Sequence, residues 1–132
     1  MARARTITQK VVVSAPPDKV YDAFVSAKKQ AAFTNSPATG AARVGGAFTT
    51  CDGYIHGVHR QLVKGKKVVQ DWHTTQWPEG APDSLLTLTF KKIKGGTEIR
   101  MVHSNVPAEQ ADGYRQGWYD YYWNPLKAYF AK

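Results

Sequence analysis

The stretch YRQGWYDYYWNPLKAYF, residues 114–130, has the strongest pattern in the sequence. Its large apolar side chains recur every three or four residues over about five turns, which predicts one long helix with an aromatic face. Those side chains are Tyr114, Trp118, Tyr121, Tyr122, Leu126, Tyr129 and Phe130. Pro107, Glu109 and Asp112 mark the expected start of the helix, because acidic side chains favour the positive end of the helix dipole. Pro125 predicts a bend, since proline lacks a backbone N–H and crowds the carbonyl of Tyr121.

Upstream of this helix, residues 39–105 consist of short β-prone runs separated by glycines. The expected strands are 47–50, 54–63, 67–75, 84–93 and 97–104, with 41–44 as a weaker candidate. Connections such as Lys64-Gly65 and Lys94-Gly95-Gly96 are too short for a crossover between parallel strands. The runs therefore predict an antiparallel meander, with 77–83 as its longest loop.

The start of the chain adds one more strand and two short helices. Residues 6–14 alternate in the manner of a strand with one apolar face. Pro16-Pro17 ends this strand and suits the first turn of a helix over 17–25. A second helix over 27–33 is expected to end at the turn formers of residues 34–37.

Together these patterns predict an α+β protein in which residues 1–132 form one domain. We expect a curved antiparallel sheet of about six or seven strands, two short helices after the first strand, and the long C-terminal helix across the concave face. The long helix is the only element large enough to cover the apolar face of the sheet. Gly117 beside Trp118 is expected to let the helix backbone approach the sheet closely.

The composition excludes several classes of protein. The 132 residues are 42% hydrophobic and 12% aromatic, which is far from the composition of a disordered chain. No apolar run approaches the roughly 20 residues of a membrane helix, and Met1-Ala2-Arg3-Ala4-Arg5 leads into no signal core. We therefore expect a soluble, cytoplasmic protein. The single cysteine, Cys51, cannot form an internal disulfide, and we expect it to be a packed strand thiol.

Residues with catalytic or metal-binding chemistry are sparse. None of the four histidines, at positions 56, 59, 73 and 103, has the i, i+2 or i, i+4 partner that metal sites commonly use. No nucleophile elbow, phosphate loop or dinucleotide fingerprint occurs. Asp71 is the only carboxylate well inside an expected strand, so paired acid–base catalysis lacks its partner. The sequence predicts no enzyme, no cofactor and no metal site.

The positive charge is concentrated in two clusters. There are 18 Lys and Arg against 10 Asp and Glu, a formal net charge of +8. The clusters, at Lys64–Lys67 and Lys91–Lys94, fall at expected hairpin turns. Such turns are ordinarily solvated, but they could also attract an acidic protein partner over a long range. Nucleic acid is disfavoured as a partner, because the aromatic side chains concentrate on the buried helix and not beside the lysines.

An aromatic helix over a concave sheet can enclose an apolar pocket. The candidates for its wall are Phe33, Trp72, Trp77, His103, Trp118 and Tyr122. His103 is expected to point inward because it shares a strand face with Ile99 and Met101, either as a core or cavity histidine or as a proton-transfer residue. The competing interpretation of all six is ordinary core packing, since aromatic rings readily fill a small core.

Six segments carry a resemblance to a known family: Ala15–Pro17, Ala32–Ala38, Gly46–Gly53, Asp71–Gly80, Leu86–Phe90 and Arg115–Tyr122. Trp77-Pro78-Glu79-Gly80 before a strand, combined with Gln116-Gly117-Trp118 in the last helix, is specific to this family. Over nearly its whole length the chain resembles the C-terminal domain of the activators of the heat-shock protein 90 ATPase. That domain is part of the helix-grip, START-like superfamily.

The resemblance implies a co-chaperone of the stress response. Such a protein binds heat-shock protein 90 near its nucleotide-binding domains, stimulates its ATPase cycle and catalyses nothing itself. Eukaryotic members typically carry a separate N-terminal docking domain, whereas this chain begins at the C-terminal-type domain, so the resemblance implies weak stimulation. Asn124-Pro125 also departs from the family, whose last helix usually lacks proline. The alternative is a START-like carrier or sensor of a small hydrophobic ligand held between the sheet and the C-terminal helix.

Overall fold

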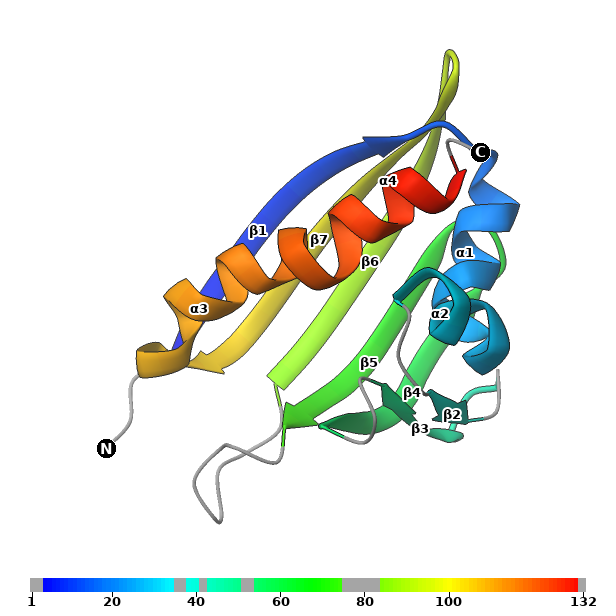
Figure 1. Ribbon diagram of the computed structural model, residues 1–132. Coiled ribbons are helices and arrows are strands. Elements are labelled where there is room, and N and C mark those ends of the chain that lie inside the picture. Colours follow the sequence, from blue (N-terminus) through cyan, green and yellow to red (C-terminus); the bar gives the residue numbers. More distant parts are fainter. Residues whose placement is uncertain (1–3, 35–37, 41–42, 51–53, 75–83, 131–132) are drawn as a thin grey trace.

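The computed structural model describes residues 4–34, 38–40, 43–50, 54–74 and 84–130. Their strands form one antiparallel sheet in the order β1-β7-β6-β5-β4-β3-β2. The strands are β1 Ala4–Val13, β2 Thr39–Gly40, β3 Ala47–Thr50, β4 Ile55–Val63, β5 Lys67–Thr74, β6 Ser84–Ile93 and β7 Gly96–Pro107. Because β1 pairs with β7, the first and last strands of the chain are neighbours (Figure 1).

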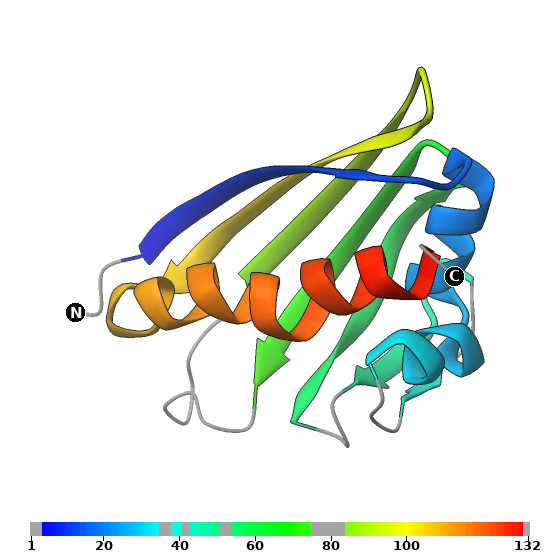
Figure 2. The same cartoon turned by 45° about the horizontal axis from the view of Figure 1, so that its top comes forward.

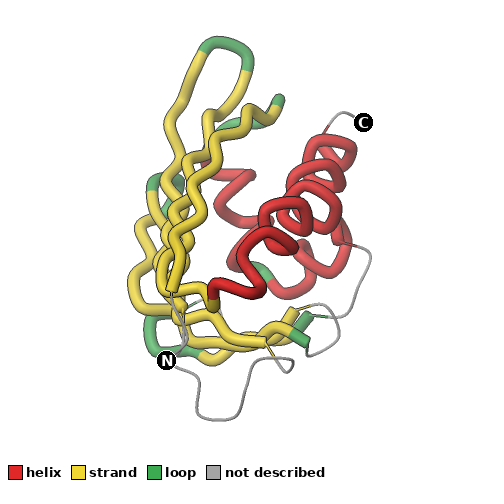
Figure 3. The backbone as a smooth tube through the Cα atoms, turned by 90° about the vertical axis from the view of Figure 1, so that its left-hand side faces the viewer, coloured by secondary structure: helices red, strands yellow, loops and turns green. Residues whose placement is uncertain are grey.

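The helices lie on one face of this sheet. They are α1 Pro17–Val25, α2 Ala27–Thr34, α3 Ala108–Trp118, the π-helical turn η1 Tyr119–Trp123, and α4 Asn124–Phe130. In Figure 2 the last three form one continuous helix across the strands, and Figure 3 shows the sheet curving around the helices on that side. The structure therefore confirms the predicted α+β architecture with its long C-terminal helix over the concave face.

The alternation of side chains along each strand builds the core. On β5, Val68, Gln70, Trp72 and Thr74 are buried, while the residues between them are partly exposed. The facing side of the C-terminal helix supplies Trp118, Trp123 and Leu126, which are all buried. Sheet and helix thus share one apolar core, which is the arrangement that the two periodicities require.

Most predicted elements are confirmed with small shifts of their ends. The strands expected at 47–50 and 84–93 and the helix at 17–25 coincide with β3, β6 and α1. The weaker strand candidate at 41–44 is wrong for its second half, because residues 43 and 44 lie in a turn. The short edge strand is instead Thr39–Gly40. The turn at 35–37, residues 41–42, Cys51 and the loop at 77–83 lie outside the described residues.

The sequence predicted a bend at Pro125, and the structure has a wide, π-helical turn immediately before this residue. In η1 the Asn124 N–H donates to the carbonyl of Tyr119, five residues back. Pro125 itself has no N–H to donate to Tyr121, so a regular α-helical bond is absent at that position. The wider turn brings the consecutive residues Tyr122 and Trp123 onto the buried face.

The expected role of Gly117 is wrong. A Cβ atom at Gly117 would meet only a ring atom of Tyr121, at an ordinary contact distance of 3.8 Å, so nothing from the sheet crowds this position. The close backbone approach occurs instead at Gly57 on β4, where a Cβ atom would overlap the carbonyl oxygen of Asp71 on β5. Local sequence could not reveal this, because the crowding comes from the neighbouring strand.

Candidate functional site

Five of the six side chains predicted to line a pocket lie together between the sheet and the helices. The ring centroids of Trp72 and His103 are 4.6 Å apart, and those of Trp118 and Tyr122 are also 4.6 Å apart. Trp118 lies 6.1 Å from Trp72, and Phe33 lies 6.3 Å from Tyr122. The aromatic cluster, defined as these five residues, is buried and its rings contact one another. Trp77 lies outside the described residues, and the cavity-lining role of all six stays a prediction.

Each member of the aromatic cluster is positioned by a different element. Trp72 comes from β5 and His103 from β7, at inward positions of their strands. Phe33 lies near the end of α2, and Trp118 and Tyr122 face the sheet from α3 and η1. The cluster therefore joins the middle of the sheet to α2 and to the C-terminal helix.

His103 is the polar centre of the aromatic cluster, with no exposed surface. The Trp118 Nε1–H donates to its Nδ1 at 3.3 Å, and its Nε2 lies 2.7 Å from the Ser84 hydroxyl oxygen. That hydroxyl donates to the carbonyl of Trp72 at 2.6 Å. Because an indole N–H can only donate, Nδ1 must be unprotonated and the proton of the neutral imidazole sits on Nε2. We call this chain of bonds from Trp118 to Trp72 the histidine relay.

Burial lowers the pKa of His103 from 6.5 to about 3. The imidazole is therefore neutral at ordinary pH, and both of its nitrogens are occupied. This arrangement stabilises a helix on a sheet, whereas general acid–base catalysis needs a group that exchanges protons near the working pH. The inward orientation expected for His103 is confirmed.

Other polar contacts hold the helix to the sheet at sites that the sequence analysis missed. Gln9 on β1 donates through Nε2 to the carbonyl of Arg115 at 2.9 Å and accepts at Oε1 from the Trp123 Nε1–H at 2.7 Å. The hydroxyls of Thr50 and Tyr122 lie 2.9 Å apart in a buried contact. Candidate residues for these contacts could have been predicted from one pattern in the sequence, which is a polar residue at an inward position of an otherwise apolar strand face. Ser84 and Thr50 are examples of this pattern.

His59 is a second buried histidine that the sequence analysis did not single out. Its ring stacks on Phe48, with 5.0 Å between centroids, and its Nδ1 lies 3.4 Å from the Gln70 side-chain nitrogen. Burial lowers the pKa of His59. Like His103, it is packed into the core as a neutral ring.

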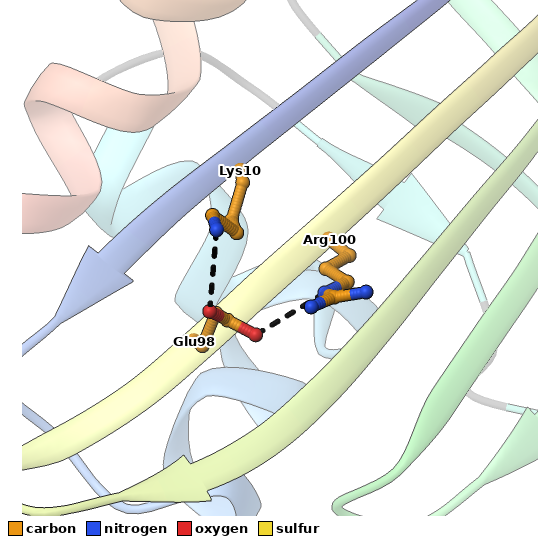
Figure 4. A network of polar contacts seen from close by, with 3 residues as sticks. All are labelled: Lys10, Glu98 and Arg100. Atoms are coloured by element: carbon orange, nitrogen blue, oxygen red, sulfur yellow. Dashed lines mark hydrogen bonds and ion pairs between the residues drawn. The ribbon is translucent and has the colours of Figure 1, made fainter.

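The opposite face of the sheet carries the charged side chains of the strands. Glu98 lies between Lys10 at 3.8 Å and Arg100 at 3.2 Å, in a network drawn in Figure 4. Asp71 is paired with the Arg60 guanidinium at 2.6 Å. The expectation that Asp71 is the only carboxylate well inside a strand is wrong, because Glu98 lies within β7. Asp71 is paired with one cation and Glu98 with two, and neither is paired with a second carboxylate.

The described part of the chain has neither a cluster of metal ligands nor a membrane-spanning helix. Within it, no three His, Cys, Asp or Glu side chains lie close enough together to hold a metal ion. No helix of that part is long and apolar enough to cross a membrane.

Sequence comparisons connect the chain to a known family. The family model described as "Activator of Hsp90 ATPase homolog 1-like protein" matches residues 14–131. The human activator of 90 kDa heat shock protein ATPase homolog 1 is 37% identical over 125 residues, which are 95% of this chain and 37% of that protein. The Dictyostelium discoideum homolog is 33% identical over 115 residues, which are 86% of this chain and 30% of that protein. The chain thus spans about a third of the length of these curated relatives.

Comparison with solved structures agrees with this family and identifies the fold. A heat-shock protein 90 activator from Plasmodium falciparum superposes with a TM-score of 0.85 at 24% identity, covering 97% of this chain and 96% of that one. A protein from Chromobacterium violaceum superposes with a TM-score of 0.76 at 26% identity, covering 96% and 97%. The sheet with its long helix is therefore the helix-grip, START-like fold, and the chain belongs to the family of proteins similar to activator of heat-shock protein 90 ATPase homolog 1.

Proposed function

We propose that this chain is a co-chaperone module that binds heat-shock protein 90, stimulates its ATPase cycle and catalyses nothing itself. The observation that carries the proposal is the family match over residues 14–131, with a relative named as an activator of this ATPase at 37% identity. Cytoplasmic location and a role in the stress response belong to the same proposal.

The chemistry of the described residues supports a binding role. The buried histidine relay has no free proton acceptor, and Asp71 and Glu98 are held in ion pairs. A protein that acts through surfaces can still change the rate of a partner's reaction. It does so by binding the hydrolysing conformation of the partner more tightly than the other conformations.

The strength of stimulation depends on how many sites engage the chaperone at once. A second linked binding domain raises the effective concentration of the first, so a domain assayed alone loses this advantage. The 132-residue chain covers only 37% of the human relative. We therefore expect the chain, assayed by itself, to stimulate less than a full-length relative at equal concentration.

The direct test is a titration of the purified 132-residue protein into full-length heat-shock protein 90 at physiological salt. ATP hydrolysis is measured with and without an inhibitor of the chaperone, so that contaminating ATPases are subtracted. A saturable rise in turnover is expected, and a chaperone variant defective in activator binding should show none.

A flat titration, at concentrations where a full-length relative saturates, would overturn the proposal. In that case the alternative is a carrier of a small hydrophobic ligand, held at the aromatic cluster beneath the C-terminal helix. Mass spectrometry of the purified protein for a bound apolar compound, together with a rise in melting temperature when that compound is added, would support this alternative.

A further inference from the structure

The topology of the sheet brings the two lysine clusters of the sequence to one end of the molecule. In an antiparallel meander, the β4–β5 and β6–β7 turns lie at the same end of the sheet, as Figure 1 shows. The β4–β5 turn is also bonded to β6, because the Phe90 N–H, three residues before that strand ends, donates to the carbonyl of Lys66 at 2.8 Å. We define the lysine end as Lys64, Lys66, Lys67, Lys91, Lys92 and Lys94.

The lysine end carries an excess of positive charge, although the Asp18 carboxylate of α1 lies beside Gly65 in the β4–β5 turn. Five of its six side chains are exposed and Lys67 is half-buried. Within the described part of the chain, none of the six forms an ion pair with a carboxylate. Glu98, which lies opposite Lys91 in the β6–β7 register, is engaged by Lys10 and Arg100 (Figure 4). The clustered ammonium groups repel one another and produce a positive electrostatic potential at this end of the sheet. This potential attracts anionic groups.

On the helices, by contrast, some positive side chains are paired with carboxylates. On α3 the Asp112 carboxylate lies 3.8 Å from the Arg115 guanidinium, and on α1 the Asp22 carboxylate lies 3.7 Å from the Lys29 ammonium of α2. Charges of both signs therefore alternate there. The excess positive charge is instead carried by the sheet, and the lysine end, which adjoins the start of α1 at Gly65, holds six of these cations.

Exposed aliphatic side chains accompany these cations. Val63 borders the β4–β5 turn and is 38% exposed, while Val12 lies opposite Glu98 and is 51% exposed. Farther along the same outer face, Val102 lies opposite Thr87, toward the middle of the sheet, and is 40% exposed. Cations mixed with exposed aliphatic groups are typical of surfaces that contact protein, because the aliphatic groups gain from contact with apolar atoms.

Nucleic acid fits this surface less well. Binding of single strands relies on exposed aromatic rings on which bases stack. The Phe and Trp rings of the described strands, Phe48, Trp72 and Phe90, are all buried on the opposite face. The lysine end thus offers charge and aliphatic contact without a stacking platform.

We propose that the lysine end, with the adjoining valines of the outer sheet face, is a docking surface for an acidic protein partner. For the identity of the partner this inference rests on the proposed function, in which the surface faces heat-shock protein 90. The charge complementarity acts mainly on the association rate, and this predicts binding that weakens as salt rises.

The test compares two variants with the same change in charge. Lys64→Glu with Lys94→Glu alters the lysine end, whereas Lys28→Glu with Lys127→Glu alters exposed lysines on α2 and α4. At low salt the first variant should bind the full-length chaperone at least about tenfold more weakly than wild type, with a shallower dependence on salt. The control variant should differ from wild type by less than about twofold. Equal effects of the two variants would overturn the proposal.

A second arm separates this surface from the proposed function. Wild type and both variants are titrated with a fluorescent poly-glutamate peptide and with duplex DNA of the same total charge. Weaker peptide binding by the Lys64→Glu, Lys94→Glu variant alone supports the docking surface, even if the chaperone is neither bound nor stimulated. Absence of peptide binding by wild type, or preference for the duplex, would overturn an acidic protein partner. Far-UV circular dichroism and melting temperature establish that each variant is folded.

Discussion

His103 shows how a single polar residue can be held at the centre of an aromatic core. Both imidazole nitrogens have partners, one in the helix and one in the sheet, so the ring is buried without an unsatisfied polar atom. The Trp118 N–H fixes the tautomer, because it can act only as a donor. A proton added to Nδ1 would place two N–H groups against each other. Neutrality of His103 is therefore a condition of the helix lying on the sheet.

This condition predicts a loss of stability in weak acid. The pKa of His103 is about 3 in the folded protein and 6.5 in the unfolded chain. The unfolded chain therefore binds the proton first as pH falls. The stability that comes from the neutral ring is fully present above pH 6.5 and is lost progressively toward about pH 3. Each pH unit in that window should remove roughly 1 kcal/mol from the free energy of unfolding. Urea unfolding between pH 7.5 and 5 measures this slope.

The contribution of His103 can be isolated from that of His59, whose pKa is also lowered by burial. His103→Gln should unfold with a shallower pH dependence than wild type, even though it is less stable at neutral pH. If this variant does not fold, the imidazole proton signals of the wild-type protein give the answer. A His103 signal that titrates near pH 6.5 in the folded protein would contradict the structure.

At the scale of elements, the sequence was most informative where a periodic pattern lasted long enough. Strands β3 and β6 and helix α1 were placed correctly because alternation and helical spacing are visible within one element. Strand β2 was missed because two residues carry no period. The π-helical turn before Pro125 was also missed. A bend and a π-helical turn can both accommodate a residue without an N–H donor, so the sequence does not distinguish between them.

Two glycines give a contrasting prediction, because one is crowded and the other is not. Gly117→Ala should stabilise the protein by about 0.5–1 kcal/mol, since alanine restricts the unfolded chain and its methyl group has room in α3. Gly57→Ala should destabilise it by about 2 kcal/mol or more, because the new methyl group would overlap the Asp71 carbonyl and force β4 from β5. Urea unfolding at pH 7.5 measures both changes.

Gly113→Ala serves as the control for the helical substitution. Nothing lies within 4 Å of a Cβ atom at Gly113, so alanine there should stabilise α3 by a similar amount. A gain at Gly113 combined with a loss at Gly117 would contradict the open space found beside Gly117.

At the scale of the whole molecule, contacts between residues far apart in the sequence could not be predicted from the sequence. The residues of the aromatic cluster were identifiable as large inward rings, but their polar partners were not. Ser84 and Gln9 come from strands far from Trp118 and Trp123 in sequence, and only the pairing of β1, β6 and β7 brings them close. The same holds for the lysine end, whose two clusters are separate in sequence and meet through the order of the strands.

These long-range contacts predict that sheet and helix unfold together. Gln9 joins β1 to both Arg115 and Trp123, so Gln9→Ala leaves the indole N–H without its acceptor and should destabilise the whole protein by about 1–3 kcal/mol. The neighbouring Lys10→Ala removes an exposed ion pair with Glu98 and should change stability by less than about 1 kcal/mol. Because Trp72, Trp118 and Trp123 all lie in the shared core, tryptophan fluorescence and far-UV circular dichroism should give coincident unfolding curves for both variants. If the fluorescence curve of Gln9→Ala preceded its circular dichroism curve, the helix would be separating from an intact sheet, and the single cooperative unit argued from these contacts would be wrong.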